Sequence, residues 1–226
     1  MVHKPRPHGP KGVNMKNPWE EIELDDYENH MKLDSVKQLQ TLNSMMKAQF
    51  DEYPVTTAMV LGVAGGNGLE HVNSDKYQTI YGVDINEKYL EAVATRYADK
   101  VDDGVLKLLK INLISEPEKL PQAELLIANL LIEYIGYDAF AKVVSAVNPR
   151  FVSCVIQINE DVCNWVSDSP YIHSFDRLDE VHHQMEEKEL AATMETIGYL
   201  EKAKMKESLP NGKAFVRIDF ENEALN

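Results

Sequence analysis

Short apolar runs alternate with amphipathic segments along most of this chain, from residue 56 to residue 198. Apolar residues in short runs predict buried strands, whereas apolar residues three and four positions apart predict helices. Three helices are expected in this region, near 86–97, 133–147 and 185–198. Five strands are expected with them, at 58–63, 79–85, 105–113, 123–131 and 150–158. Strands that alternate with helices indicate a parallel sheet covered by helices on both faces.

The C-terminal region follows a different pattern. Two β-type runs within residues 199–221 flank Asn211-Gly212, which is the strongest short signal for a β-hairpin. A dinucleotide-binding domain of the common kind ends in parallel strands, so the hairpin indicates another variant of the doubly wound α/β fold. We therefore expect a seven-stranded sheet, mostly parallel, with an antiparallel C-terminal hairpin strand and additional N-terminal helices.

The region before the first strand is predicted to be helical. Asp34 or Ser35 is expected to cap the second of two helices at its N-terminus. The apolar positions of that helix fall on one face: Val36, Leu39, Leu42, Met46 and Phe50. Three parts are predicted in all: a flexible tail at 1–16, an N-terminal helical cap at 17–54, and a Rossmann-like domain at 55–226.

Composition limits the classes of partner. The net charge of −14 over 226 residues argues against a nucleic-acid partner, which normally requires a basic patch. No run approaches the roughly 18 apolar residues of a membrane helix. The basic N-terminal tail lacks the apolar core of a secretory signal, and Met15 is a candidate for the natural start of the protein. Cys154 and Cys163 form neither a disulfide framework nor a metal cluster. We expect a cytoplasmic protein without a metal that binds a small molecule.

The loop after the first strand, residues 62–68, is unusually bare: Gly-Val-Ala-Gly-Gly-Asn-Gly. In open α/β sheets, ligands bind beyond the carboxyl ends of the strands, where this loop lies. Small residues allow a ligand to approach the backbone, and the N–H groups of a following helix can bind an anion. Gly66, Gly68 and Ala64 are expected to contact the ligand. The alternative is that such a loop only packs a helix against a strand.

Asp84 strengthens the ligand hypothesis. It ends the second expected strand, eighteen residues after Gly66, close to the offset of about 20 residues at which an acid reaches ribose hydroxyls. A carboxylate fits an unmodified ribose and would repel a phosphorylated one. The alternative is that Asp84 caps the following helix.

These residues carry a family resemblance. The segments VLGVAGGNG, YGVDINEKYLEAV, LLKINL and AELLIANLLIEYIG resemble, in order, the four motifs of the class I S-adenosylmethionine-dependent methyltransferases. The terminal hairpin is similar to the antiparallel seventh strand of that family. The resemblance spans about Val55 to Phe220, and it implies S-adenosylmethionine as cofactor and methyl transfer to a small-molecule acceptor.

The resemblance also implies roles for particular residues. Asp84 would bind the ribose hydroxyls with Ile85 against the adenine, Asn112 and Leu113 would hold the adenine edge, and Asn129 would lie beside the sulfonium. The complete set of expected cofactor contacts is Tyr27, Gly62, Val63, Ala64, Gly66, Gly68, Asp84, Ile85, Asn112, Leu113 and Asn129.

Two positions depart from the family pattern and keep other functions open. The family usually has an acid where this chain has Gly62, and a glycine where it has Ala64. In the family, this acid normally organises the methionine end of the cofactor, so a carboxylate from elsewhere in the chain would have to replace it here. The alternative is a non-catalytic protein that binds S-adenosylmethionine. A nicotinamide-dependent oxidoreductase is a further alternative, but the third glycine of its fingerprint is absent after Gly68.

Methyl transfer from a sulfonium needs alignment and a dry pocket, and a hydroxyl or protonated amine acceptor also needs a base. His30, Glu133 and Tyr134 are the candidate catalytic residues. Tyr27 shares a helix face with His30, and the resemblance suggests that Tyr27 caps the cofactor. The alternatives are a surface histidine at position 30 and an acid that satisfies the helix dipole at position 133. Trp19 is either a lid or a hydrophobic anchor.

One further segment is a candidate substrate loop. Residues 173–183 combine aromatic, charged and histidine residues. Because His182 and His183 are adjacent, their side chains should point in different directions, which disfavours a metal site built on that pair.

Overall fold

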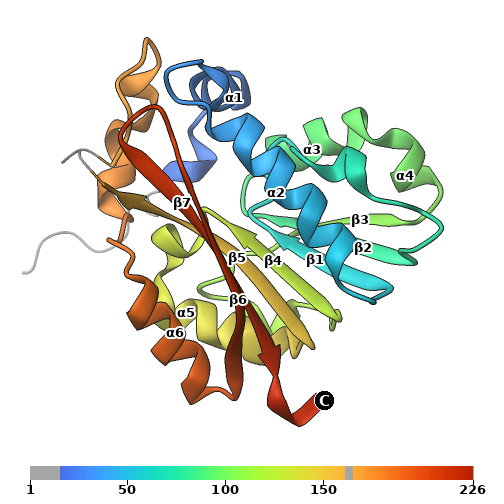
Figure 1. Ribbon diagram of the computed structural model, residues 1–226. Helices are drawn as coiled ribbons and strands as arrows, with labels where there is room; N and C mark the ends of the chain where they lie inside the picture. Colours follow the sequence, from blue (N-terminus) through green and yellow to red (C-terminus); the bar gives the residue numbers. More distant parts are fainter. Residues whose placement is uncertain (1–15, 161–164, 226) are drawn as a thin grey trace, which may run out of the picture.

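The computed structural model describes residues 16–160 and 165–225, and a seven-stranded sheet forms its centre (Figure 1). The strand order is β3-β2-β1-β4-β5-β7-β6. All pairs from β3 to β5 are parallel, whereas β7 is antiparallel to both β5 and β6. The strands are β1 Thr57–Leu61, β2 Thr79–Asp84, β3 Leu106–Lys110, β4 Leu125–Asn129, β5 Phe151–Asn159, β6 Tyr199–Ser208 and β7 Lys213–Asn222. The predicted fold class is confirmed.

Helices cover both faces of the sheet (Figure 1). Apolar side chains of α5 and α6 pack on one face, and those of α2 and α3 pack on the other. The α-helices are α1 Leu24–Lys32, α2 Gln38–Glu52, α3 Glu87–Arg96, α4 Ala98–Asp102, α5 Ile132–Val147 and α6 Glu187–Thr196. Short 3-10 helices lie at η1 Pro18–Glu20, η2 Leu69–His71, η3 Pro117–Lys119, η4 Ile172–Glu180 and η5 Glu223–Leu225.

The start of α2 differs from the prediction. Asp34 and Ser35 do not cap this helix, because the backbone turns before it: the N–H groups of Val36 and Lys37 both donate to the carbonyl of Leu33. Lys37 occupies the N-cap position with φ of 56° and makes no side-chain capping bond. A left-handed residue at this point changes the direction of the chain, so α1 and α2 can pack against each other over the sheet.

A buried polar network fixes α2 to the sheet. Gln49 is fully buried and donates to Ser153 Oγ on β5 at 2.9 Å. Ser153 in turn bonds Asp219 on β7, which also accepts from the hydroxyl of Tyr53 at 2.7 Å and from Arg217 at 2.6 Å. Buried polar groups are stable only when they are hydrogen-bonded, so this network specifies where α2 lies relative to the ends of β4 and β5.

Two predictions concern residues outside the described ranges. Most of the predicted flexible tail lies in residues 1–15, and Cys163 is also outside the described ranges. Cys154 is buried and unpaired, and its thiol donates to the carbonyl of Ile218 at 3.3 Å. Within 16–160 and 165–225, no helix combines the length and apolar character needed to span a bilayer.

Candidate functional site

A cavity of about 700 Å³, counted with its opening to solvent, lies at the carboxyl ends of the parallel strands. We call it the strand-end cavity. Gly62 and Ala64 line it after β1, Asp84 at the end of β2, Asn112 after β3 and Asn129 at the end of β4. Five of the predicted cofactor contacts from four separate strands are therefore brought together.

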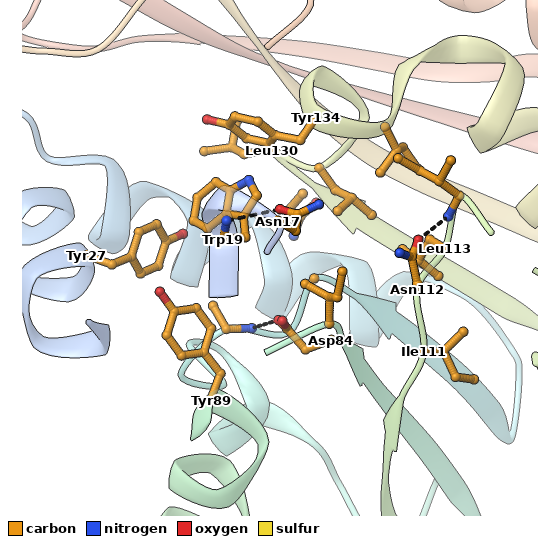
Figure 2. A pocket seen from close by; sticks show the side chains of 17 residues that line it. Asn17, Trp19, Tyr27, Asp84, Tyr89, Ile111, Asn112, Leu113, Leu130 and Tyr134 are labelled. Atoms are coloured by element: carbon orange, nitrogen blue, oxygen red, sulfur yellow. Dashed lines mark hydrogen bonds between the residues drawn. The ribbon is translucent and has the colours of Figure 1, made fainter. Parts of the chain in front are cut away.

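The walls of this cavity differ in character (Figure 2). In that view, the aromatic side chains of Trp19, Tyr27 and Tyr89 lie on one side of the cavity. Ile111, Asn112 and Leu113 lie on the other side. Ile85 and Leu113, both predicted to contact adenine, are part of the lining. The oxygen of Asn112 accepts from the backbone N–H of Ile114 at 3.0 Å, which fixes the side chain at the cavity edge. Apolar side chains with one amide beside them suit a purine base.

Asp84 is held at the cavity wall by backbone donors. Its Oδ2 accepts from the N–H of Ala64, and its Oδ1 accepts from the N–H of Asn86, both at 2.9 Å. The N-cap of α3 is Asn86, whose side chain accepts from Lys88 N at 3.0 Å, so Asp84 does not cap this helix. Burial raises the pKa of Asp84, and its backbone hydrogen bonds oppose that shift. Each carboxylate oxygen keeps a lone pair for a ligand.

The glycine loop divides into two parts. Gly62 and Ala64 line the strand-end cavity with φ values of 63° and 46°, whereas Gly66 and Gly68 do not line it. A methyl group at Gly66 would lie 2.7 Å from the Tyr97 ring, and one at Gly68 would lie 2.8 Å from Met46. The absence of side chains at these two positions is thus explained by packing. The packing interpretation applies to Gly66 and Gly68, whereas contact with a ligand stays a prediction for Gly62 and Ala64, which line the cavity.

A smaller hollow of about 490 Å³, again counted with open space, lies between this loop and the first two helices. We call it the loop cavity. Val63, Ala64 and Asn129 line it together with Glu28 of α1. Glu28 lies directly on the loop, because a methyl group at Gly65 would be 2.0 Å from its Oε1. Sequence reasoning could not single out Glu28, since it precedes the loop by a whole helix.

Two of these side chains are held by neighbouring groups. Arg96 of α3 binds the Glu28 carboxylate with N–O distances of 2.7 and 3.1 Å. Asn129 forms a reciprocal pair with Gln49 of α2, with both hydrogen bonds at 2.9 Å. The amide of Asn129 is therefore turned toward α2, and its position at the end of β4 is fixed by the buried network described above.

The segment before α1 crosses the strand-end cavity and is tied to α3. Asn86 Nδ2 donates to the carbonyl of Trp19, and the Tyr89 hydroxyl donates to the carbonyl of Ile22, both at 2.9 Å. The Trp19 ring meets Tyr27 and Tyr134 edge-on, with centroid distances of 5.8 and 4.8 Å. Trp19 thus lines the cavity and packs in an aromatic cluster at the same time.

A second chamber of about 560 Å³, including open space, adjoins the strand-end cavity. The two share four lining residues: Trp19, Tyr27, Leu130 and Tyr134. We call it the aromatic chamber, because Trp165 and Phe175 also line it. Phe175 lies in η4, so the segment suspected from sequence to be a substrate loop does contribute to this chamber. His182 also lines it, stacked on Trp165 at 4.0 Å.

Glu133 is a buried acid in the wall of the aromatic chamber. Its side chain is 4% exposed; Oε1 accepts from the N–H of Gln157 at 2.9 Å, and Oε2 has no partner among the described residues. Burial raises the pKa of Glu133 to about 7, against the opposing effect of its backbone hydrogen bonds. A carboxyl group with this pKa can exchange a proton near neutral pH.

His30 and Tyr134 line the same chamber but differ in protonation. His30 is buried rather than on the surface, and its Nδ1 lies 2.8 Å from Ser169 Oγ. Burial, assisted by the charge of Lys213, lowers the pKa of His30 to about 4. Burial also raises the pKa of Tyr134 well above its usual value. Both side chains are therefore neutral at pH 7, and His30 is the weaker base of the His30–Glu133 pair.

Lys213 is the charged residue that sequence reasoning missed. It is the first residue of β7, is 1% exposed, and donates from Nζ to the carbonyl of Trp165. Burial lowers the pKa of Lys213 to about 8. No sequence pattern indicated a cation in the core here, because position 213 shares its alternation along β7 with the polar residues Arg217 and Asp219.

The adjacent histidines have different surroundings. His182 lines the aromatic chamber and His183 does not; Nε2 of His183 would lie 3.7 Å from a methyl group placed at Gly136. Over the described part of the chain, no three His, Cys, Asp or Glu residues are grouped as a metal site would require.

Comparisons with known proteins identify the fold. No family model and no curated protein matches this sequence. Among solved structures, magnesium protoporphyrin IX methyltransferase (ChlM) from Synechocystis PCC 6803 with bound SAM is similar, with 10% identity, 95% of this chain and 87% of that chain covered, and a TM-score of 0.57. The N-methyltransferase NodS from Bradyrhizobium japonicum WM9 has 10% identity, 84% and 99% coverage, and a TM-score of 0.59. The [4+2]-cyclase SpnF has 9% identity, 80% coverage of both chains, and a TM-score of 0.61.

These similarities establish that the chain has the fold of the class I S-adenosylmethionine-dependent methyltransferases. The insertion of β7 between β5 and β6 also separates it from the standard dinucleotide-binding order 3-2-1-4-5-6. Because a cyclase shares this fold, the fold alone does not select the reaction. The site must do so.

Proposed function

We propose that this protein is an S-adenosylmethionine-dependent methyltransferase with a small-molecule acceptor. The observation that carries the proposal is the shared wall of the two cavities: the strand-end cavity, with Asp84 on its wall, meets the aromatic chamber at Trp19, Tyr27, Leu130 and Tyr134. A cofactor in the first cavity can thus meet an acceptor in the second. We propose a cytoplasmic location, in keeping with the sequence composition.

The residues of the strand-end cavity fit the nucleoside part of the cofactor. The free lone pairs of Asp84 would accept hydrogen bonds from both ribose hydroxyls. Ile85 and Leu113 would pack on the adenine, and the amide of Asn112 would bind its edge. Tyr27 would close the cavity from α1. When bound, S-adenosylmethionine supplies an electrophilic methyl group on a sulfonium.

Glu28 is proposed to replace the acid that is missing at Gly62. An acid at position 62 would need a β-carbon only 3.0 Å from Leu131 Cδ1, in a backbone conformation with φ of 63° that side chains rarely adopt. Glu28 brings a carboxylate to the same loop from α1, held in place by Arg96. It would pair with the ammonium group of the methionine part of the cofactor, in the loop cavity.

Glu133 is proposed to be the general base. Glu133 lies in the chamber wall next to Tyr134, and its Oε2 has no partner among the described residues. The pKa of Glu133, about 7, is closer to neutral pH than that of His30. A base works best when its pKa is near the working pH. Tyr134, whose hydroxyl stays protonated, would shape the wall between acceptor and cofactor.

Calorimetric titration tests the cofactor proposal. We expect the wild-type protein to bind S-adenosylmethionine and not NADH. Asp84→Ala should weaken binding by at least tenfold, because a charge-assisted hydrogen-bond acceptor is lost, and Glu28→Gln should weaken it less. Asp138→Ala, at an exposed position of α5, is the matched control. Unchanged affinity in a folded Asp84→Ala protein would overturn the proposal.

The non-catalytic alternative needs a separate measurement. Release of S-adenosylhomocysteine in the presence of acceptor mixtures, followed by mass spectrometry, distinguishes turnover from binding alone. Methylated product is expected; binding without product from any acceptor would favour a binding protein.

A further inference from the structure

Lys213 is a buried cation that has no ion-pair partner in the described part of the protein. Among the described residues, no carboxylate lies within 4.0 Å of its Nζ, which bonds only the carbonyl of Trp165. Arg217, four residues along the same strand and 4% exposed, is paired with both Asp219 and Glu52. Buried charges are normally paired. The lone cation faces the aromatic chamber, so the partner it lacks can come from a ligand.

Two residues that line the same chamber each have a buried polar atom without a partner among the described residues. Trp19 Nε1, a donor, and Glu133 Oε2, an acceptor, are the buried side-chain polar atoms that lack a partner in the described part of the chain. Both residues line the aromatic chamber. A single hydroxyl group satisfies both kinds of atom, because it donates one hydrogen bond and accepts others.

The position of Trp19 relates this hydroxyl to the cofactor. Trp19 belongs to the wall shared with the strand-end cavity, whereas Lys213 and Trp165 line the aromatic chamber alone. A ligand with its anion at Lys213 and its hydroxyl between Trp19 and Glu133 therefore directs the hydroxyl toward the cofactor. The rings of Tyr134, Trp165 and Phe175 around it favour a planar ligand.

We propose that the acceptor is a small aromatic acid with a hydroxyl group, whose carboxylate is bound by Lys213 and whose hydroxyl oxygen is methylated. This inference rests on the proposed function and specifies its substrate class. The hydroxyl proton passes to Oε2 of Glu133, the acceptor oxygen forms the new O–CH₃ bond, and the electron pair of the broken S–CH₃ bond stays on sulfur as a neutral thioether.

The test compares acids with their neutral esters. The probes are 2-, 3- and 4-hydroxybenzoate, the three corresponding methyl esters, and benzoate, which lacks the hydroxyl. Binding is measured by calorimetry and methyl transfer by mass spectrometry. In the wild-type protein, at least one hydroxybenzoate is expected to bind roughly tenfold or more tightly than its ester, because the acid alone gains a charge-assisted hydrogen bond. Benzoate should bind but yield no product.

Lys213→Met should bring the affinities of acid and ester together, because methionine keeps the length of the side chain without its charge. Lys142→Met, which removes a charge from the exposed face of α5, should leave the preference unchanged. Equal binding of acid and ester by the wild-type protein, or a preference that persists in Lys213→Met, would overturn the inference. The wild-type comparison needs no variant, so it decides the question even if Lys213→Met misfolds.

The two proposals fail in different ways. Titration with S-adenosylmethionine alone tests the cofactor and does not involve the acids. If the cofactor binds and the acids do not, the substrate class is wrong and the proposed function stands. If the cofactor does not bind but the acid preference depends on Lys213, the chamber is an anion-binding site and the methyltransferase proposal fails.

Discussion

At the scale of single residues, burial gives neighbouring groups different protonation states. Glu133 and His30 line one chamber, yet burial raises the pKa of the first to about 7 and lowers that of the second to about 4. Desolvation disfavours the charged form in both cases, which is the anion for glutamate and the cation for histidine. As a result, Glu133 can take up a proton near neutral pH, whereas His30 stays uncharged at that pH.

The first prediction follows from the pKa of Glu133. A base must be deprotonated to act, so kcat/KM should increase as the pH rises through about 7 and level off above it. Glu133→Gln should lower kcat by roughly a hundredfold or more and remove this pH dependence, with S-adenosylmethionine affinity unchanged. The measurement is a pH–rate profile of both proteins between about pH 5 and pH 9.

His30→Gln is the comparison variant for this experiment. Because His30 is neutral throughout this pH range, its replacement should keep the same inflection even if kcat changes. An inflection that disappears in His30→Gln but persists in Glu133→Gln would assign the base to the histidine instead.

At the scale of elements, the loop after β1 packs against its neighbours with some residues and lines the strand-end cavity with others. Gly66 faces Tyr97, whose hydroxyl donates to the Gly66 carbonyl at 2.8 Å, and Gly68 faces Met46 of α2. Ala64 lines the cavity, and its backbone N–H donates a hydrogen bond to Asp84. The packing contacts hold the loop against α2 and α3, and this fixes the part that would meet a ligand.

The second prediction separates steric from conformational cost in this loop. Gly66 and Gly104 have similar φ values, 79° and 75°, but only Gly66 has neighbours within 4 Å of an added methyl group. Gly104→Ala should therefore cost only the strain of a left-handed alanine, about 1 kcal/mol. Gly66→Ala should cost that strain plus the displacement of Tyr97, together on the order of 3 kcal/mol. Urea unfolding of the two variants measures both values, and equal losses would contradict the steric explanation.

At the scale of the whole molecule, regular elements were predictable, whereas the aromatic chamber was predictable only in part: His30, Glu133 and Tyr134 were singled out from the sequence, and Lys213 and Trp165 were not. The alternation of apolar runs predicted each parallel strand, and the Asn211-Gly212 signal predicted the hairpin that joins β6 to β7. The N-terminus of α2 was mispredicted, because the left-handed Lys37 has no signature in a single sequence. Four strand ends bring Asp84 and its neighbours together by topology, so the lining of the strand-end cavity followed from motifs.

The aromatic chamber has a different origin. Its residues come from α1, the start of α5, η4 and the first residue of β7. Segments such as 165–182 have no periodic pattern, and long-range packing alone decides which of their side chains meet. Lys213 is the clearest case, because its burial depends on the contact between the hairpin and the segment that contains Trp165.

The last prediction concerns the two buried cations of β7, which should respond in opposite ways to removal. Arg217 is bound to Asp219 and Glu52, and its replacement by methionine would leave a buried carboxylate without its cation. A loss of about 3–5 kcal/mol is expected. Lys213 has only a carbonyl partner in the described structure, so Lys213→Met should increase stability at neutral pH.

The pH dependence checks the cause of that increase. Burial lowers the pKa of Lys213 from 10.5 to about 8, so the folded state binds this proton less tightly than the unfolded state does. The wild-type protein should therefore gain stability as the pH rises from about 8 to 10.5, by at most about 3 kcal/mol. Lys213→Met should lack this gain. Urea unfolding at pH 7 and pH 10 measures both proteins, and a destabilised Lys213→Met at pH 7 would show that the lysine is paired in the folded protein.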